Sequence, residues 1–259
     1  MRNGVLNVDK IKTIFNNKKE KNMELKLVSW NMNYWQRNES QRLEAWEYLK
    51  NLNFDIAVLQ ETKPFFNCIE NYNVIFQNLP VKDGWGSAII SKKFTSYKHS
   101  FISSYEGSQA LICYDFEFEK GKNVTIINLY GKSDTYGYCT TTIHHMLSDI
   151  TPIVWGKSKN IIIMAGDLNT SIQWDENYKN RDPLHKLVFD RIDDMGFINC
   201  TMVKYKEHKQ TFVRENTFPY QDDYVFIKNC KGKWDINILN NENILNFSDH
   251  YPVELIIEI

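Results

Sequence analysis

The sequence lacks the features that mark several large classes of protein. Its five cysteines include no CxxC pair, which argues against both a disulfide framework and a zinc site. The formal net charge is -1 at pH 7, so only a local basic groove, and no overall basic field, could attract nucleic acid. No Pro/Gly/Ser-rich linker, low-complexity tract or internal repeat divides the chain.

Long hydrophobic runs are also absent. Residues 1–22 contain no apolar stretch of the length that a signal peptide needs, and nowhere does the chain approach a membrane-spanning run. We therefore expect a soluble, cytoplasmic protein without a membrane span. Residues 1–22 end in a polar, charged stretch, and we interpret them as an N-terminal extension of uncertain order. Short amphipathic structure around residues 8–15 is the alternative.

The composition is that of a globular protein with a sizeable core. Hydrophobic residues make up 42% of the chain, aromatic residues 14% and charged residues 24%, and these proportions differ from those of disordered chains. A chain of 259 residues can form one large domain or two small ones. Because no linker is present, one domain over residues 23–259 is the simplest interpretation.

Short apolar runs alternate with three segments of helical periodicity. Helices are predicted at 39–51, 140–154 and 182–195, the last with Asp182 as N-cap, Pro183 as first helical residue and a stop at Gly196. Ten runs have strand composition, at residues 25–30, 55–60, 72–77, 86–91, 110–118, 124–130, 161–166, 223–227, 234–239 and 251–259.

Ten strands exceed what a single open sheet comfortably holds, and the amphipathic helices need apolar faces to cover. Two packed sheets with helices outside, in an α/β fold, fit both requirements. Ligands of such folds commonly bind beyond strand ends. The residues that end the apolar runs are therefore the first candidates for function.

Polar residues recur at these strand ends. They are carboxylates, amides, one histidine and one tyrosine. Asn31 and Asn33 follow VSW, Glu61 follows AVLQ, Tyr130 follows INL, Asp167 and Asn169 follow MAG, Asp249 and His250 follow NFS, and Asp222 and Asp223 begin the run DDYVF.

This set of side chains suits a limited chemistry. Carboxylate and amide oxygens are ligands for Mg²⁺ or Mn²⁺, whereas zinc would require more histidine or cysteine. An Asp together with a lone His supplies an oriented imidazole, and Asp167 and Asn169 point to the same side of an extended stretch. Such groups could align a water molecule and hold a phosphate. A single Asp or Asn after a strand is more often a turn former, and only the joint pattern favours function.

The ordered motifs SWNMN, LQET, NLYG, AGDLNTS, DDYVF and SDHYPV resemble the endonuclease/exonuclease/phosphatase superfamily, which has the deoxyribonuclease I-like fold, over roughly residues 24–259. The resemblance implies a four-layer α/β/β/α sandwich of two mainly antiparallel sheets flanked by helices. It also implies hydrolysis of a phosphoester with Mg²⁺, or alternatively Mn²⁺, as cofactor.

The resemblance further assigns a metal site. Glu61 matches the family's metal ligand, Asn31 matches a residue that orders the metal site, and Asp249 matches a carboxylate close to the metal. Asn33 stands where apurinic endonucleases carry an Asp, which leaves one fewer negative charge near the metal. Tyr130 occupies the position of a phosphate-binding Tyr in those enzymes.

Catalytic roles are assigned in the same way. Asp167 matches the residue that positions or deprotonates the attacking water, and Asn169 matches the partner that orients Asp167 and the scissile phosphate. His250 corresponds to a phosphate-contacting histidine. Asp223, rather than Asp222, is aligned with the residue that hydrogen-bonds the histidine ring and fixes its tautomer.

The substrate is the least determined property. An intracellular nuclease acting on DNA or RNA is favoured. The alternatives are a phosphatase or phosphodiesterase for a small nucleotide or phospholipid head group, and a catalytically silent binding module. Trp35, Trp85 and Trp174 lie near the motif loops, where they either stack on bases or fill the core. Arg214, also near these loops, either contacts phosphate or is a solvated surface charge. No protein partner is indicated, and the oligomeric state is left open.

Overall fold

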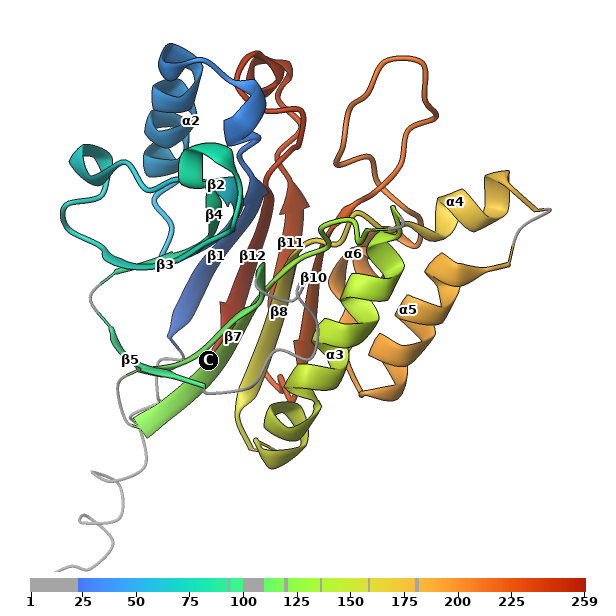
Figure 1. Ribbon diagram of the computed structural model, residues 1–259. Helices are drawn as coiled ribbons and strands as arrows, with labels where there is room; N and C mark the ends of the chain where they lie inside the picture. The colour runs from blue at the N-terminus through green and yellow to red at the C-terminus, as the bar shows by residue number, and fades with distance from the viewer. Residues whose placement is uncertain are drawn as a thin grey trace, which may run out of the picture.

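The computed structural model describes residues 23–92, 94–99, 110–118, 121–135, 137–157, 159–179 and 182–259. The predicted N-terminal extension, residues 1–22, lies outside these ranges. The described chain contains two six-stranded sheets with helices on both outer sides (Figure 1). The predicted α/β fold with two packed sheets is therefore confirmed.

The first sheet has the order β11-β12-β1-β2-β4-β3. Only β1 and β2 are parallel, and the other neighbours are antiparallel. The strands are β1 (Glu24–Asn31), β2 (Ile56–Thr62), β3 (Asn73–Asn78), β4 (Gly86–Ser91), β11 (Trp234–Ile238) and β12 (Val253–Glu258).

The second sheet has the order β5-β6-β7-β8-β10-β9. Here β7 and β8 form the parallel pair, so both sheets are mixed but mainly antiparallel. The strands are β5 (Thr95–Lys98), β6 (Ile112–Phe118), β7 (Lys122–Tyr130), β8 (Ile161–Asp167), β9 (Ile198–Asn199) and β10 (Asp223–Lys228). All ten predicted runs contain a strand, whereas the short β5 and β9 were not predicted.

Three of the described helices match the predicted helices, and two short ones were not predicted. The α-helices are α2 (Glu39–Asn51), α3 (Cys139–Gly156), α4 (Ile172–Asn177), α5 (Leu184–Asp194) and α6 (Cys200–Tyr205). The described 3-10 turns are η1 (Tyr34–Gln36), η2 (Phe66–Cys68), η3 (Lys82–Gly84) and η6 (Glu242–Asn246). None of the described helices has the length and hydrophobicity that a bilayer crossing requires.

The predicted N-terminus of α5 is wrong. Asp182 is not its N-cap and Pro183 is not its first helical residue; the helix begins at Leu184, and Pro183 occupies the cap position without a side-chain hydrogen bond. The reason is that α4 supplies the cap. The carboxylate of Asp175 accepts the backbone N–H of Lys186 at 2.7 Å and that of His185 at 3.4 Å, so free N–H groups of the first turn are satisfied from another helix.

The side chains of β8 show why the fold has four layers. Ile162 and Met164 belong to the apolar cluster that includes α3 and α5, whereas Ile163 and Ala165 belong to the cluster between the sheets. Successive strand residues point to opposite faces, so a continuous apolar run is expected where both faces are covered. On the other side, Trp30 of β1 packs in a third cluster with α2. The predicted α/β/β/α layering follows from these three cores.

Gly166 brings β8 close to β7 directly before Asp167. Its φ is 150°, and a Cβ atom there would lie 1.8 Å from the carbonyl oxygen of Leu129, its register partner in β7. No side chain fits at that distance from a backbone atom. The glycine therefore allows the backbones of β8 and β7 to approach closely directly before Asp167.

We predict that Gly166→Ala lowers the free energy of unfolding by about 2 kcal/mol or more, because the new methyl group must push β8 away from β7. Urea titration followed by circular dichroism measures the change. Gly156→Ala, on α3 with no heavy atom within 4 Å of the added carbon, is the matched control and should be neutral or stabilising by up to about 1 kcal/mol. Equal effects of the two substitutions would contradict this account of Gly166.

Candidate active site

Strand directions bring the predicted site residues to one edge of the sandwich. Tyr130, at the end of β7, is the register partner of Asp167, at the end of β8, and Asp167 is also the partner of Asp223, which begins the antiparallel β10. In the first sheet, Asn31 ends β1, and His250 lies just before the antiparallel β12. The ends of both sheets thus deliver polar side chains to the same place.

Asp167 is the centre of this group. Its side chain is completely buried, and three hydrogen bonds hold its carboxylate. Asn31 Nδ2 donates to Oδ2 at 2.8 Å, the backbone N–H of Asn169 donates to Oδ1 at 2.8 Å, and Asn169 Nδ2 donates to Oδ2 at 3.1 Å. Asn169 adopts the left-handed conformation, with φ of 46°, which folds its amide back onto Asp167.

The predicted contact between His250 and Asp223 is confirmed. Nδ1 of the buried imidazole lies 2.8 Å from Asp223 Oδ2, and Nε2 faces Asp167 Oδ2 at 4.0 Å. A ring of Phe212 packs on the imidazole, with centroids 4.6 Å apart. The backbone N–H of His250 donates to Ser248 Oγ, whose hydroxyl in turn donates to the carbonyl of Asn31. The imidazole is therefore fixed on two sides.

Burial and nearby charge set the protonation of this group. Burial raises the pKa of Asp167 to about 7, and the positive charge of His250 acts against that rise. For His250 burial alone would lower the pKa, but the carboxylates of Asp223, Asp167 and Asp249 together hold it well above its usual value. Near neutral pH the site thus contains an imidazolium beside an acid that readily exchanges a proton.

Glu61 is held by a distorted strand. Its φ of 43° is left-handed, and the pairing of β2 with β4 shifts register between Leu59 and Thr62. Such a bulge redirects a side chain. A left-handed conformation costs a non-glycine residue about 1 kcal/mol or more, and strained residues of this kind are common at functional positions. Burial raises the pKa of Glu61, and Tyr130 Oη donates to its Oε1 at 2.7 Å.

Asn33 and Asp249 form a second polar pair near Glu61. Asn33 Nδ2 donates to Asp249 Oδ1 at 2.7 Å, while the buried Oδ1 of Asn33 has no hydrogen-bond partner in the described chain. The charge of Asp249 also contributes to the raised pKa of Glu61. Two carboxylates and an unpartnered amide oxygen are the donor set that Mg²⁺ or Mn²⁺ takes, usually together with water. By the chemistry of their donor atoms, these three residues, which we call the metal group after the role proposed below, fit the divalent cation that the fold family implies.

Asp167, Asp223 and His250 offer ligand atoms that all lie within 4.8 Å of one another, but their contacts fit a hydrogen-bonded relay better than a cation site. Nδ1 of His250 is already hydrogen-bonded to Asp223, and three hydrogen bonds already hold the carboxylate of Asp167. Together with Asn31 and Asn169, these three residues form what we call, after the role proposed below, the water-activating group.

Tyr130 lies at the predicted strand end, but its hydroxyl has a partner that the sequence did not predict. The phosphate contact remains a prediction, whereas the structure shows the tyrosine buried at 6% exposure with its hydroxyl on Glu61. Burial and the charge of Glu61 raise the pKa of Tyr130 well above its usual value, so its hydroxyl remains a donor.

The three tryptophans near the motif loops differ in their exposure. Trp85 is buried against Tyr130, Trp35 is 54% exposed, and Trp174 lines a cavity.

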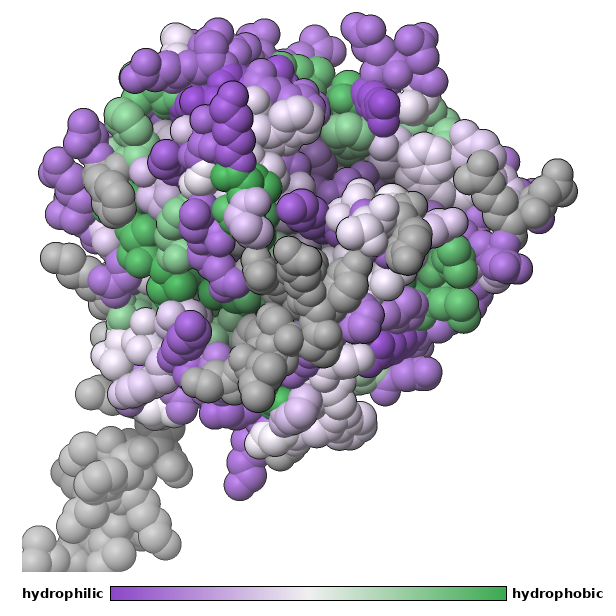
Figure 2. Space-filling view, in the orientation of Figure 1, coloured by the Kyte–Doolittle hydropathy of each residue, from purple (hydrophilic) through white to green (hydrophobic). Residues whose placement is uncertain are grey.

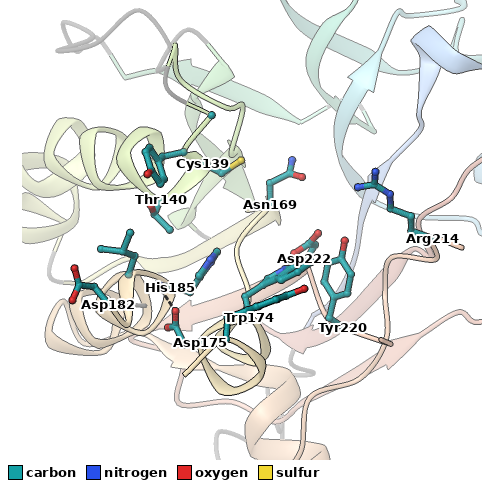
Figure 3. A pocket seen from close by; sticks show the side chains of 14 residues that line it. Cys139, Thr140, Asn169, Trp174, Asp175, Asp182, His185, Arg214, Tyr220 and Asp222 are labelled. Atoms are coloured by element: carbon teal, nitrogen blue, oxygen red, sulfur yellow. Dashed lines mark hydrogen bonds between the residues drawn. The ribbon is translucent and has the colours of Figure 1, made fainter. Parts of the chain in front are cut away.

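This cavity of about 870 Å³ opens beside Asn169 and was not predicted (Figure 3). Its lining includes Trp174, His185, Tyr220 and Asp222. Their sequence signal is weak, because they come from α4, α5 and the segment before β10, which only the fold brings together. The adjacent acids at the start of β10, and the place of Trp174 near a motif loop, were the available indications.

Comparisons with known structures support the fold. No protein-family model and no curated protein matches the sequence. An AP endonuclease from Archaeoglobus fulgidus is 17% identical, with TM-score 0.69, covering 91% of this chain and 100% of that one. A 3′-5′ exonuclease (NExo) from Neisseria meningitidis is 16% identical, with TM-score 0.68 and coverage of 91% and 100%.

A third similar structure carries the family name itself. It is an endonuclease/exonuclease/phosphatase family protein from Leptotrichia buccalis, 14% identical, with TM-score 0.63 and coverage of 91% and 100%. The resemblance predicted from the six motifs is therefore confirmed at the level of the fold, which is the deoxyribonuclease I-like fold. Identities this low do not extend to activity.

We predict that Asp223→Asn lowers the pKa of His250, because burial then opposes the imidazolium without its nearest carboxylate. The shift is measured by NMR titration of the imidazole in chelator-treated protein. In the wild type, the raised folded-state pKa means that protonation of His250 stabilises the fold below about pH 6.5, and this contribution is lost as pH rises through the folded-state pKa. Asp190→Asn, on the exposed face of α5, is the control, and an unchanged His250 pKa in Asp223→Asn would contradict the assignment.

Proposed function

We propose that this protein is a divalent-metal-dependent phosphoester hydrolase, and that it cleaves phosphodiester bonds of nucleic acid by in-line attack of water. The observation that carries the proposal is the buried Asp167 carboxylate, held by Asn31 and Asn169 and facing Nε2 of His250 at 4.0 Å. A carboxylate and an imidazolium aimed at one space suit a reaction in which water loses a proton while a phosphoryl oxygen gains negative charge.

Each side chain of the water-activating group has a separate role in this reaction. Asp167, whose pKa is about 7, accepts the proton of the attacking water. Asn31 and Asn169 keep its carboxylate in one orientation. His250 donates from Nε2 to a phosphoryl oxygen, and Asp223 holds Nδ1 so that the ring does not turn.

The metal group completes the proposed site. Glu61, Asp249 and the unpartnered Oδ1 of Asn33 would hold Mg²⁺, with Mn²⁺ as alternative. The bound cation would supply neutralising charge for the phosphoryl oxygens and the leaving group. Tyr130 keeps Glu61 in place through its hydroxyl, and it would become available to phosphate only if this hydrogen bond were released.

Nucleic acid is the proposed substrate because similar structures include an AP endonuclease and a 3′-5′ exonuclease. The alternative, a small nucleotide or phospholipid head group, is favoured by the cavity beside Asn169, whose volume lies within the range of roughly 300–1,000 Å³ that small-molecule sites show. We also propose a cytoplasmic location, which the five free cysteines support.

Asp167→Asn and His250→Ala should each reduce the rate of cleavage by about 100-fold or more while leaving the fold intact, because each removes one preorganised polar group. Supercoiled plasmid, single-stranded DNA, RNA and small phosphoesters are incubated with Mg²⁺, Mn²⁺ or chelator. Asp190→Asn is the control variant. Cleavage that survives both active-site substitutions, or that proceeds in chelator, would refute the proposed function; cleavage of small phosphoesters alone would select the alternative substrate.

Glu61→Gln should weaken binding of Mn²⁺ about tenfold or more, since it replaces a charged ligand by a neutral one. Electron paramagnetic resonance of free Mn²⁺ gives the dissociation constant without relying on activity. Glu207→Gln, at an exposed position where the carboxylate pairs with Lys209, should bind Mn²⁺ as the wild type does. The metal group is wrongly assigned if both substitutions have the same small effect.

A further inference from the structure

The cavity beside Asn169 is built from four separate parts of the chain. Cys139 and Thr140 of α3, Trp174 of α4, His185 of α5 and the segment that ends in Tyr220 and Asp222 all line it. Figure 2 shows pale side chains of intermediate hydropathy over α4, with more apolar surface over α5. Because Asn169 belongs both to the cavity and to the water-activating group, a molecule bound here lies next to the proposed point of cleavage.

Asp222 supplies a polar group at the base of this cavity. The residue is 3% exposed, and its Oδ1 is buried without a hydrogen-bond partner in the described chain. Its backbone is fully used, since the N–H donates to Thr211 Oγ1 at 3.0 Å and the carbonyl accepts the N–H of Leu168 at 2.9 Å. A buried polar atom without a partner costs free energy unless something that enters the site satisfies it.

The neighbouring Asp223 has a different task. Its Oδ2 is bonded to His250, whereas no hydrogen bond of the described chain involves the side chain of Asp222. In Figure 3 the Asp222 carboxyl points toward the side on which Asn169 lies. Burial, and then the charge of Asp167, hold the pKa of Asp222 well above its usual value, and a neutral carboxyl both donates and accepts hydrogen bonds.

Aromatic rings form the wall next to this carboxyl. Trp174 stacks on Tyr178 with centroids 5.6 Å apart and an angle of 13° between planes, and Tyr220 meets Trp174 at 4.9 Å and 65°. Trp174 is only half buried, so its ring remains accessible from the cavity. A wall of this kind suits a flat aromatic ligand, and the carboxyl beside it suits a ligand whose edge carries hydrogen-bonding groups.

A nucleobase has both properties, whereas a bare sugar phosphate or a lipid head group lacks the flat aromatic ring. Arg214, exposed at the cavity, adds a cation for an attached phosphate. We propose that this cavity binds the base of the nucleotide adjoining the cleaved bond, with its ring against Trp174 and its hydrogen-bonding edge on Asp222. This inference rests on the proposed function and names the feature of the substrate that the site selects.

The first test measures binding, independently of hydrolysis. Adenosine 5′-monophosphate and ribose 5-phosphate are titrated into chelator-treated protein, with tryptophan fluorescence and calorimetry as readouts. The adenine nucleotide should bind about tenfold tighter or more than the base-free compound, and Asp222→Leu should remove most of that difference. Asp222→Asn keeps a polar group of the same shape and should retain it, which separates loss of the contact from loss of the fold. Equal affinities for the two compounds in the wild type would overturn the proposal.

The second test asks whether a polynucleotide uses the same cavity. Single-stranded oligonucleotides carry, at each position in turn, a natural base, a non-polar ring of the same shape or an abasic unit, and kcat/KM is compared. The wild type should prefer the natural base by about tenfold, and Asp222→Leu should reverse the preference between the natural base and its non-polar replacement. Asp190→Asn should behave as wild type.

The outcomes of the two tests separate this inference from the proposed function. Cleavage without any dependence on the base, together with equal affinities for the two free compounds, overturns the base site but leaves the hydrolase standing. Base-dependent binding of the free nucleotide without cleavage of any phosphoester supports the base site and rejects the hydrolase. Base dependence for the free nucleotide but not for the oligonucleotide supports the site and makes the free nucleotide its ligand.

Discussion

The structure depends on one costly arrangement, the burial of the Asp167 carboxylate where the two sheets meet. A carboxylate without solvent exposure must be compensated by hydrogen bonds and opposite charge. Here Asn169 follows β8, the strand of Asp167 in the second sheet, whereas Asn31 and the imidazole of His250 both come from the first sheet. Because the partners arrive from both sheets, the packing of the sandwich and the chemistry of the site depend on each other.

The layered fold could be predicted because its evidence is local. Alternating polar and apolar residues, and continuous apolar runs such as that of β8, indicate strands with one or two covered faces. The N-terminus of α5 was predicted wrongly because its cap, Asp175, is supplied by another helix, and no local pattern contains that information. The strands β5 and β9 and the helices α4 and α6 are too short to show periodicity.

The candidate site was predictable to the extent that motifs place residues at strand ends. The contact of Asp223 with His250 could be anticipated, but the hydrogen bond from Tyr130 to Glu61 could not, since it depends on the bulge that turns Glu61. The cavity is a product of the tertiary structure. Trp174 and Asp222 are 48 residues apart in sequence by their numbers and meet only after the sandwich has formed. Most of the features that we propose to distinguish substrates therefore lie outside the motifs that indicate the reaction, although Asp222 belongs to the motif DDYVF.

The central claim is that water, aimed by Asp167, displaces the leaving group in a single in-line step. The stereochemical course at phosphorus tests this most directly, with a phosphodiester analogue that is chiral at phosphorus, cleaved in ¹⁸O-labelled water in the presence of Mg²⁺ or Mn²⁺. The account predicts one labelled oxygen in the phosphate product and inversion at phosphorus. Retention of configuration would show a covalent intermediate and contradict it.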